Sequence, residues 1–134
     1  MLIRATILDS LAVRDTFTNL STVSTVTDAS AVTFTAAQVV GGLILRDPNG
    51  AGRADLVPTV ASLYTELARP EAGQSFEFTI RNTADAAETI TVTTNTGWTL
   101  SGTMTIAQNN SKRFLVVFAS PTAATLYSLG TVVH

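Results

Sequence analysis

The chain contains no cysteine and only one histidine, and these absences exclude several kinds of chemistry. Without cysteine there is no disulfide framework, no thiolate metal site and no thiol catalysis. The single histidine, His134, is the last residue, so we expect neither a multi-histidine metal centre nor a histidine-based triad. We therefore predict no catalytic residue, no cofactor-binding residue and no metal ligand. The protein is expected not to be an enzyme and to need no cofactor.

Charge is also scarce. Charged residues make up 13% of the 134 residues and the net charge is -2, whereas a typical soluble domain has roughly 25%. The longest basic cluster is Lys112-Arg113, too short to neutralise a phosphate backbone, so no nucleic-acid partner is expected. No basic amphipathic face indicates a membrane partner, and the longest apolar runs, at 43–45 and 114–119, are too short to span a bilayer. The first residues lack the apolar run of a secretory signal, which favours a protein made in a cytoplasm.

The residues that are present favour one β-rich domain. Hydrophobic residues make up 46% of the chain, and 23 Thr and 10 Ser supply most of the polar surface. Apolar and polar residues alternate at 76–80, 90–92 and 104–106, which predicts half-buried strands. The run at 114–118 does not alternate, which predicts a strand covered on both faces. Further strands are expected at 125–133 and at 39–45, where Gly41-Gly42 indicates a bulge or a close backbone approach.

With turn signals every ~8–12 residues, these strands predict an all-β fold, an antiparallel β-sandwich or a jelly-roll-like barrel. One short helix is expected near 59–68, because apolar residues recur there at helical spacing. Thr59 is its predicted N-cap and Pro70 ends it.

The first 35 residues differ in composition from the rest. Residues 16–35 are a biased Thr/Ser/Val stretch that favours extended backbone but specifies its strand register poorly. Three interpretations stay open: an irregular strand on a solvated face, an arm or edge strand that orders on a neighbouring subunit, and disorder. We expect residues 1–35 to form an N-terminal extended arm or edge strands, and residues 36–134 to form the β domain.

Carboxylates and serines are the residues most able to carry chemistry here. The pairs Glu66/Glu71 and Glu77/Glu88 could be paired carboxylates, with Glu77 and Glu88 facing each other on neighbouring strands, but solvated charges are favoured. Serine nucleophiles such as Ser75 and Ser111 lack a base, because the only histidine is terminal.

Two further features have competing interpretations. Asp47, Asn49 and Asp55 could hold Ca²⁺, but they lack the EF-hand order, so turn capping is favoured. The Gly-rich turn at 47–52 lacks the Lys and helix of a phosphate loop. Trp98 is a core or turn-packing residue or a contact to a partner.

Several strings of the sequence resemble small virion proteins of tailed bacteriophages, of the decoration (cement) or head-fibre kind. The resemblance covers about residues 36–134 and lies in the segments 41–50, 56–59, 73–83, 88–92, 102–117 and 127–130. It transfers no active site. It implies a homotrimeric structural protein on the capsid surface, assembled in the bacterial host cytoplasm, with the major capsid protein as its partner. The alternative is a fibre or tip module that binds a host receptor or carbohydrate.

Overall fold

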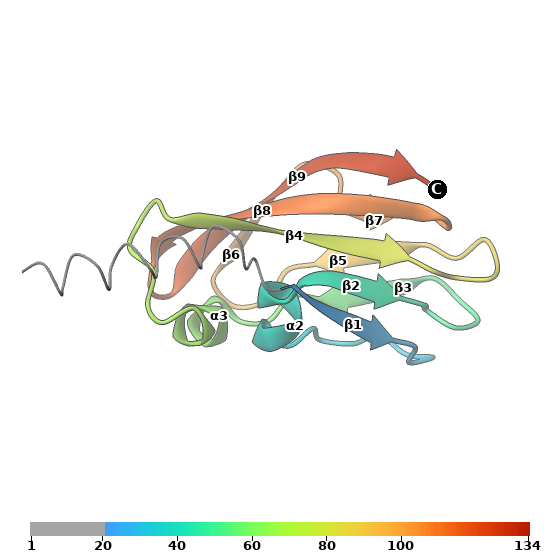
Figure 1. Cartoon of the computed structure of the whole chain (residues 1–134), viewed down its shortest axis with the longest axis horizontal. Coiled ribbons are helices and arrows are strands. Elements are labelled where there is room, and N and C mark those ends of the chain that lie inside the picture. Colours follow the sequence, from blue (N-terminus) through green and yellow to red (C-terminus); the bar gives the residue numbers. More distant parts are fainter. Residues whose placement is uncertain (1–20) are drawn as a thin grey trace, which may run out of the picture.

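The computed structural model describes residues 21–134, which form two β-sheets around one core (Figure 1). The larger sheet has six strands in the order β1-β2-β4-β8-β9-β6, and the smaller has three in the order β3-β5-β7. The strands are β1 (Thr22–Val26), β2 (Gly42–Arg46), β3 (Arg53–Leu56), β4 (Ser75–Asn82), β5 (Ile90–Thr93), β6 (Trp98–Ser101), β7 (Thr105–Ile106), β8 (Asn110–Ser120) and β9 (Ala123–Val133). The helices are α2 (Ala36–Val40) and α3 (Val60–Glu66).

The core lies between the two sheets and is built from every second residue of their strands. The larger sheet contributes residues such as Phe78, Ile80 and Phe114, and the smaller contributes Ile90 and Ile106, each at most 2% exposed. The rings of Phe78 and Phe114 stack across β4 and β8 with centroids 5.3 Å apart. The strands predicted from alternation are thus confirmed, because the period of two decides which face of a strand is buried.

The expected antiparallel arrangement is wrong. Four of the seven strand pairings among residues 21–134 are parallel, namely β1–β2, β2–β4, β3–β5 and β6–β9. The connection from β1 to β2 contains α2, and the connection from β2 to β4 contains α3. Such crossovers return the chain to the end of the sheet from which it started, so the joined strands run in the same direction. The described residues are mostly β, consistent with the expected all-β class, but neither a β-sandwich nor a jelly roll is confirmed, and neither sheet closes into a barrel.

The described residues form two helices where one was expected. The predicted helix is confirmed as α3 with Thr59 as its N-cap, although it ends at Glu66. The additional helix, α2, replaces the first part of the strand expected at 39–45. A capping box begins it: the Thr35 hydroxyl accepts from the Gln38 N–H and the Gln38 side chain accepts from the Thr35 N–H. The sequence Thr-Ala-Ala-Gln carries this signal, which was missed.

Two glycines mark places where backbones approach closely. A Cβ on Gly41 would lie 2.8 Å from the Thr22 carbonyl oxygen, so the predicted close approach at the glycine pair is confirmed. Gly97 has a φ of +93°, and a Cβ there would clash with the Thr122 carbonyl oxygen. Gly97 therefore satisfies both a left-handed turn and tight packing against the start of β9.

Among residues 21–134, strand β8 is covered by a second layer on one face only, whereas two covered faces were expected. Phe114, Val116 and Phe118 are buried in the core, whereas Leu115 and Val117 are half-buried on the opposite face. The smaller sheet packs against one side of the larger sheet, so the other side faces outward. An uninterrupted apolar run therefore did not indicate two covered faces here.

Residues 21–35 belong to the same core as the rest of the described chain. Strand β1 is the edge strand of the six-stranded sheet, and Val26 and Phe34 are 7% and 1% exposed. Strand β1 is thus an edge strand in the sheet of its own chain. The first twenty residues of the expected arm lie outside the described residues.

A buried ion pair fastens the segment after β1 to β2 and β3. Arg46 and Asp55 are both 0% exposed, and Arg46 Nε donates to Asp55 Oδ2 at 2.7 Å. The Arg46 guanidinium also donates to Asp55 Oδ1 and to the carbonyl oxygens of Asp28, Ser30 and Asp47. Because all its contacts lie within hydrogen-bond distance, the cation is satisfied without water.

Candidate interaction surface

The side of the six-stranded sheet that faces away from the core is the most extensive candidate surface. We call it the outer face. It carries, in strand order, Val23, Thr25, Leu43, Leu45, Glu77, Thr79, Arg81, Ser111, Arg113, Leu115, Val117, Thr125, Tyr127 and Val132. One row runs straight across five strands, from Thr25 through Leu45, Arg81 and Ser111 to Val132. Residues of β1 at one edge of the sheet and of the end of β9 near the other therefore lie at the same position along the strand direction.

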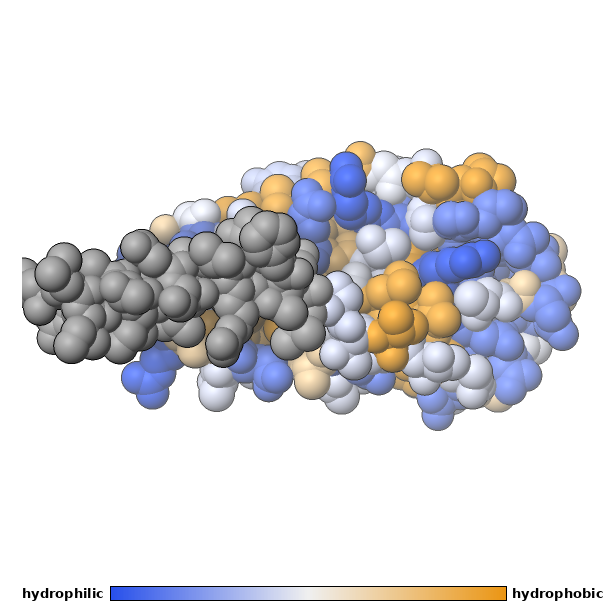
Figure 2. All heavy atoms as spheres, in the orientation of Figure 1, coloured by the Kyte–Doolittle hydropathy of each residue, from blue (hydrophilic) through white to orange (hydrophobic). Residues whose placement is uncertain are grey.

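Apolar side chains are exposed at several places on this face. Val23 is 56% exposed on β1, Val132 is 59% exposed on β9, and Tyr127 is 40% exposed. Figure 2 shows hydrophobic residues gathered over β1 and β2 and again along the end of β9. Burying such a surface against a partner is favourable by about 25 cal/mol per Å² of apolar area.

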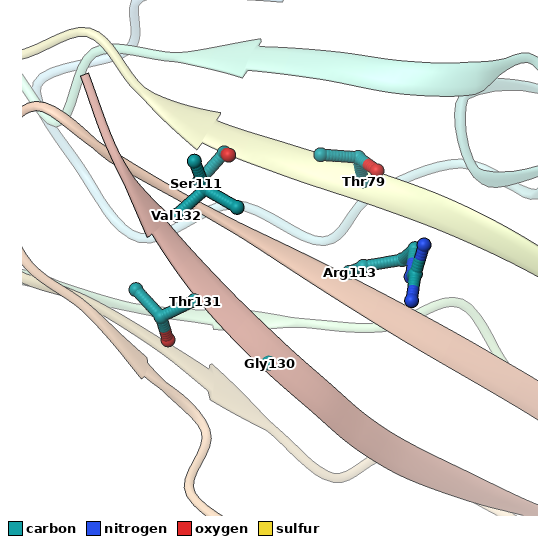
Figure 3. Close-up of a pocket in the computed structure, with 6 residues that line it drawn as sticks. All are labelled: Thr79, Ser111, Arg113, Gly130, Thr131 and Val132. Carbon is teal, nitrogen blue, oxygen red and sulfur yellow. The ribbon is translucent and has the colours of Figure 1, made fainter.

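A shallow pocket of about 260 Å³ interrupts the outer face near the end of β9 (Figure 3). It lies where Gly130 stands opposite Arg113, and a Cβ on Gly130 would meet no atom within 4 Å. Thr79, Ser111 and Thr131 are among its lining residues. Arg113 is largely exposed and lies 3.6 Å from Glu77, a weak surface pair. The pocket can accept a polar group of a partner.

His134 contacts a serine that was expected to have no base. Its Nε2 lies 2.8 Å from the Ser111 hydroxyl oxygen, because the pairing of β8 with β9 brings the end of the chain to the start of β8. The terminal position of the histidine was expected to leave Ser111 without a base, and this expectation is wrong. A catalytic serine also needs a group that orients the histidine and donors for an oxyanion. No hydrogen bond to Nδ1 occurs within residues 21–134, and the contact fastens the end of the chain to β8.

The structure does not bring Glu77 and Glu88 together. Glu77 lies exposed on the outer face, whereas Glu88 is 7% exposed in the loop before β5. Glu88 Oε1 accepts from the Gly50 N–H at 2.8 Å, and Oε2 has no hydrogen-bond partner. The expectation that Glu77 and Glu88 face each other on neighbouring strands is therefore wrong. Glu66 and Glu71 are both exposed around the end of α3.

The oxygen-rich loop after β2 also separates its candidate ligands. Asp47 Oδ1 accepts from the Asn49 N–H at 2.9 Å, which is the predicted turn capping. Asp55 instead uses both oxygens in the buried pair with Arg46. No group of three or more His, Cys, Asp or Glu residues converges among the residues that the structure describes.

Trp98 packs at the edge of the core. Its indole Nε1 donates to the Pro58 carbonyl oxygen at 2.6 Å, and the side chain packs against the core cluster. Of its two interpretations, turn packing accounts for these contacts. Ser75 is exposed at the start of β4, away from His134 and Ser111.

Comparisons with known proteins find no match for this chain: no family model, no curated protein and no solved structure matches it. Within residues 21–134, no helix is both long and apolar enough to cross a membrane.

Proposed function

We propose that the protein is a structural subunit of a tailed-phage virion, a decoration (cement) protein that binds the major capsid protein as a homotrimer and stabilises the head. The proposal is supported by the resemblance of its strand and turn strings to phage virion proteins. The observation that carries it furthest is the outer face, which combines exposed apolar residues with few charges.

Cement function needs contact area and no reactive centre. Each contact of on the order of 400 Å² of apolar surface contributes roughly 10 kcal/mol before the cost of association. Repeated around a shell, contacts of this kind resist pressure from within. A cyclic trimer fits a three-fold position of a capsid, because each symmetric copy presents the same surface.

The alternative is a fibre or tip module that binds a receptor or carbohydrate. Trp98, the single tryptophan, could serve as a platform for a sugar, but its indole N–H already donates to the Pro58 carbonyl oxygen and its side chain packs against the core. Sugar recognition needs an exposed aromatic face, and Tyr127, which is 40% exposed, is the remaining candidate on the outer face. We therefore favour the decoration role.

The test is binding to expanded empty capsids compared with binding to host-cell polysaccharide. We expect the wild type to bind capsids and not polysaccharide. Tyr127→Lys places a charge on the outer face and should weaken capsid binding at least tenfold. Thr105→Lys is the matched control, because Thr105 is an exposed strand residue of the smaller sheet. Binding to polysaccharide without binding to capsids would refute the proposal.

A further inference from the structure

The end of β9 has an edge that no described strand covers. Strand β8 pairs with β9 on one side through to Val133. On the other side β6 pairs only with residues 124–127, and within residues 21–134 nothing pairs with the following stretch. At the opposite side of the sheet, β2 is the one strand among the described residues that pairs with β1. Among the described residues, the six-stranded sheet thus leaves unpaired one edge of β1 and one edge at the end of β9, each of about five residues, in addition to the outer edge of the four-residue β6.

The backbone hydrogen bonds identify which peptide groups point out of these edges. The His134 N–H donates to the Asn109 carbonyl oxygen, so the alternation of an antiparallel pair directs the peptide groups of Thr131 and Val133 away from β8. On β1, the Thr22 N–H donates to Gly41 and the Val26 carbonyl accepts from Asp47.

Since peptide groups alternate along a strand, those of Val23 and Thr25 point away from β2. Each edge therefore offers two N–H and two C=O groups to a partner.

Within residues 21–134, neither edge carries a charged residue or a proline, although the open stretch of β9 begins at the irregularity opposite Arg113 and Phe114. Isolated edges are usually protected by charged residues, by proline or by a covering segment. The sequence Thr-Val-Ser-Thr-Val of β1 and the sequence Leu-Gly-Thr-Val-Val at 129–133 contain neither charge nor proline. Val133 is 75% exposed and Leu129 is 42% exposed. These edges are suited to strand pairing with another chain.

We propose that the occupant is a second copy of this chain, whose β1 pairs in parallel with β9. Strand β1 is parallel to β2 and β4, β8 is antiparallel to β4, and β9 is antiparallel to β8. Strands β1 and β9 therefore run in the same direction, as Figure 1 also shows.

The outward groups of Thr131 and Val133 then alternate with those of Val23 and Thr25, as a parallel ladder requires. This register places Val132 opposite Thr25 of the next copy.

The matching positions of the two edges along the strand direction support a pairing between copies. Thr25 and Val132 belong to the same straight row across the outer face. Pairing one with the other extends that row into the next copy with little shift along the strands. The contact joins two different surfaces, so repeating it produces a ring when the rotation closes. The inference identifies the contact within the proposed homotrimer and rests on the proposed function only for the number of copies.

Disulfide trapping tests the register directly, because the chain has no other thiol. Opposite residues on neighbouring strands have Cα atoms about 5 Å apart, within the range that a disulfide spans. Single variants Thr25→Cys and Val132→Cys are mixed in equal amounts and oxidised. We expect a covalent dimer from the mixture and none from either variant alone. A Thr105→Cys variant mixed with Val132→Cys is the control and should give none.

Other occupants give different results. A covalent dimer from Val132→Cys alone would mean that β9 pairs with β9 of a second copy, and it would overturn the proposal. So would the absence of any dimer, or a wild type that sediments as a monomer at micromolar concentration. The double variant Thr25→Cys/Val132→Cys reports the number of copies, since its ladder ends at the size of a closed ring. A ladder beyond trimer supports the edge pairing and contradicts the homotrimer.

A proline variant tests the backbone contact. Val133→Pro removes an N–H that points to the open edge, and proline is tolerated where a strand's N–H faces outward. We expect it to weaken association at least tenfold, whereas Val133→Thr retains the N–H and should associate like the wild type. Unchanged association of the proline variant would overturn the proposal. If pairing occurs in solution but capsids are not bound, the inference stands and the proposed function fails.

Discussion

The buried Arg46–Asp55 pair gives the sharpest prediction about stability. Arg46→Met retains most of the apolar volume but removes every donor of the guanidinium. Asp55 would then keep one hydrogen bond, from the Val32 N–H at 3.0 Å, and three carbonyl oxygens would lose a donor. Removing one partner of a buried pair costs about 3–5 kcal/mol, because the other charge stays buried and unpaired. Domains are stable by only about 5–15 kcal/mol, so the variant should lose a large share of its stability.

Urea unfolding followed by the fluorescence of the single tryptophan, Trp98, measures this loss. The midpoint should fall sharply, and the melting temperature should drop by roughly 10–20 °C. Arg113→Met is the matched control in the same sheet. Its side chain is 62% exposed and its Nε lies 3.6 Å from the Glu77 carboxylate, which makes a weak surface pair. Removing it should lower the free energy of unfolding by less than about 1 kcal/mol. Equal losses in the two variants would refute the reasoning.

Three further outcomes are expected. Burial lowers the pKa of Lys112 from its ordinary 10.5. Between the lowered pKa and 10.5 the unfolded chain therefore binds more protons than the folded chain, so the free energy of unfolding rises with pH. Urea titrations of Lys112→Met should lack that rise, and equal pH slopes for the variant and the wild type would contradict the prediction. Gly97→Ala should destabilise more than Gly50→Ala in thermal melts, because both have φ near +95° but only the first adds a clash; equal shifts would argue against the clash. Deleting residues 1–30 should lower the melting temperature markedly, because it removes β1 and two carbonyl oxygens that accept from Arg46. Deleting residues 1–20 should retain a cooperative thermal transition. Unchanged stability after the longer deletion would show that β1 is dispensable.

The sequence predicted which residues are buried better than it predicted how strands pair. Alternation around Phe78 and Ile90 identifies the buried face, because side chains of a strand point to opposite sides. The same alternation occurs in parallel and antiparallel sheets, so it could not show that β2 runs parallel to β4. That direction depends on the helices in the connections, and α2 was missed although Thr35 and Gln38 carry a capping signal.

The polar contacts were largely beyond the sequence. Asp55 was assigned to a turn-rich loop, and nothing local indicates that it meets Arg46 nine positions earlier inside the fold. The contact between His134 and Ser111 depends on the register of β8 with β9, which includes two irregularities. A hairpin prediction for these two strands would have placed the histidine near the serine. The turn role of Asp47 was predictable because it is local.

The position of β8 in the larger sheet has a consequence for synthesis of the chain. Strand β8 lies between β4 and β9, yet it and β9 are made last among the described strands. At about 5–20 residues per second, the ribosome needs roughly 1–5 s to make residues 110–133. During that interval Phe78 and Ile80 of β4 have no neighbour on one side of their strand. The nascent chain thus has an apolar strand with one open edge, which is prone to aggregation, and the sheet becomes continuous only after both late strands have emerged.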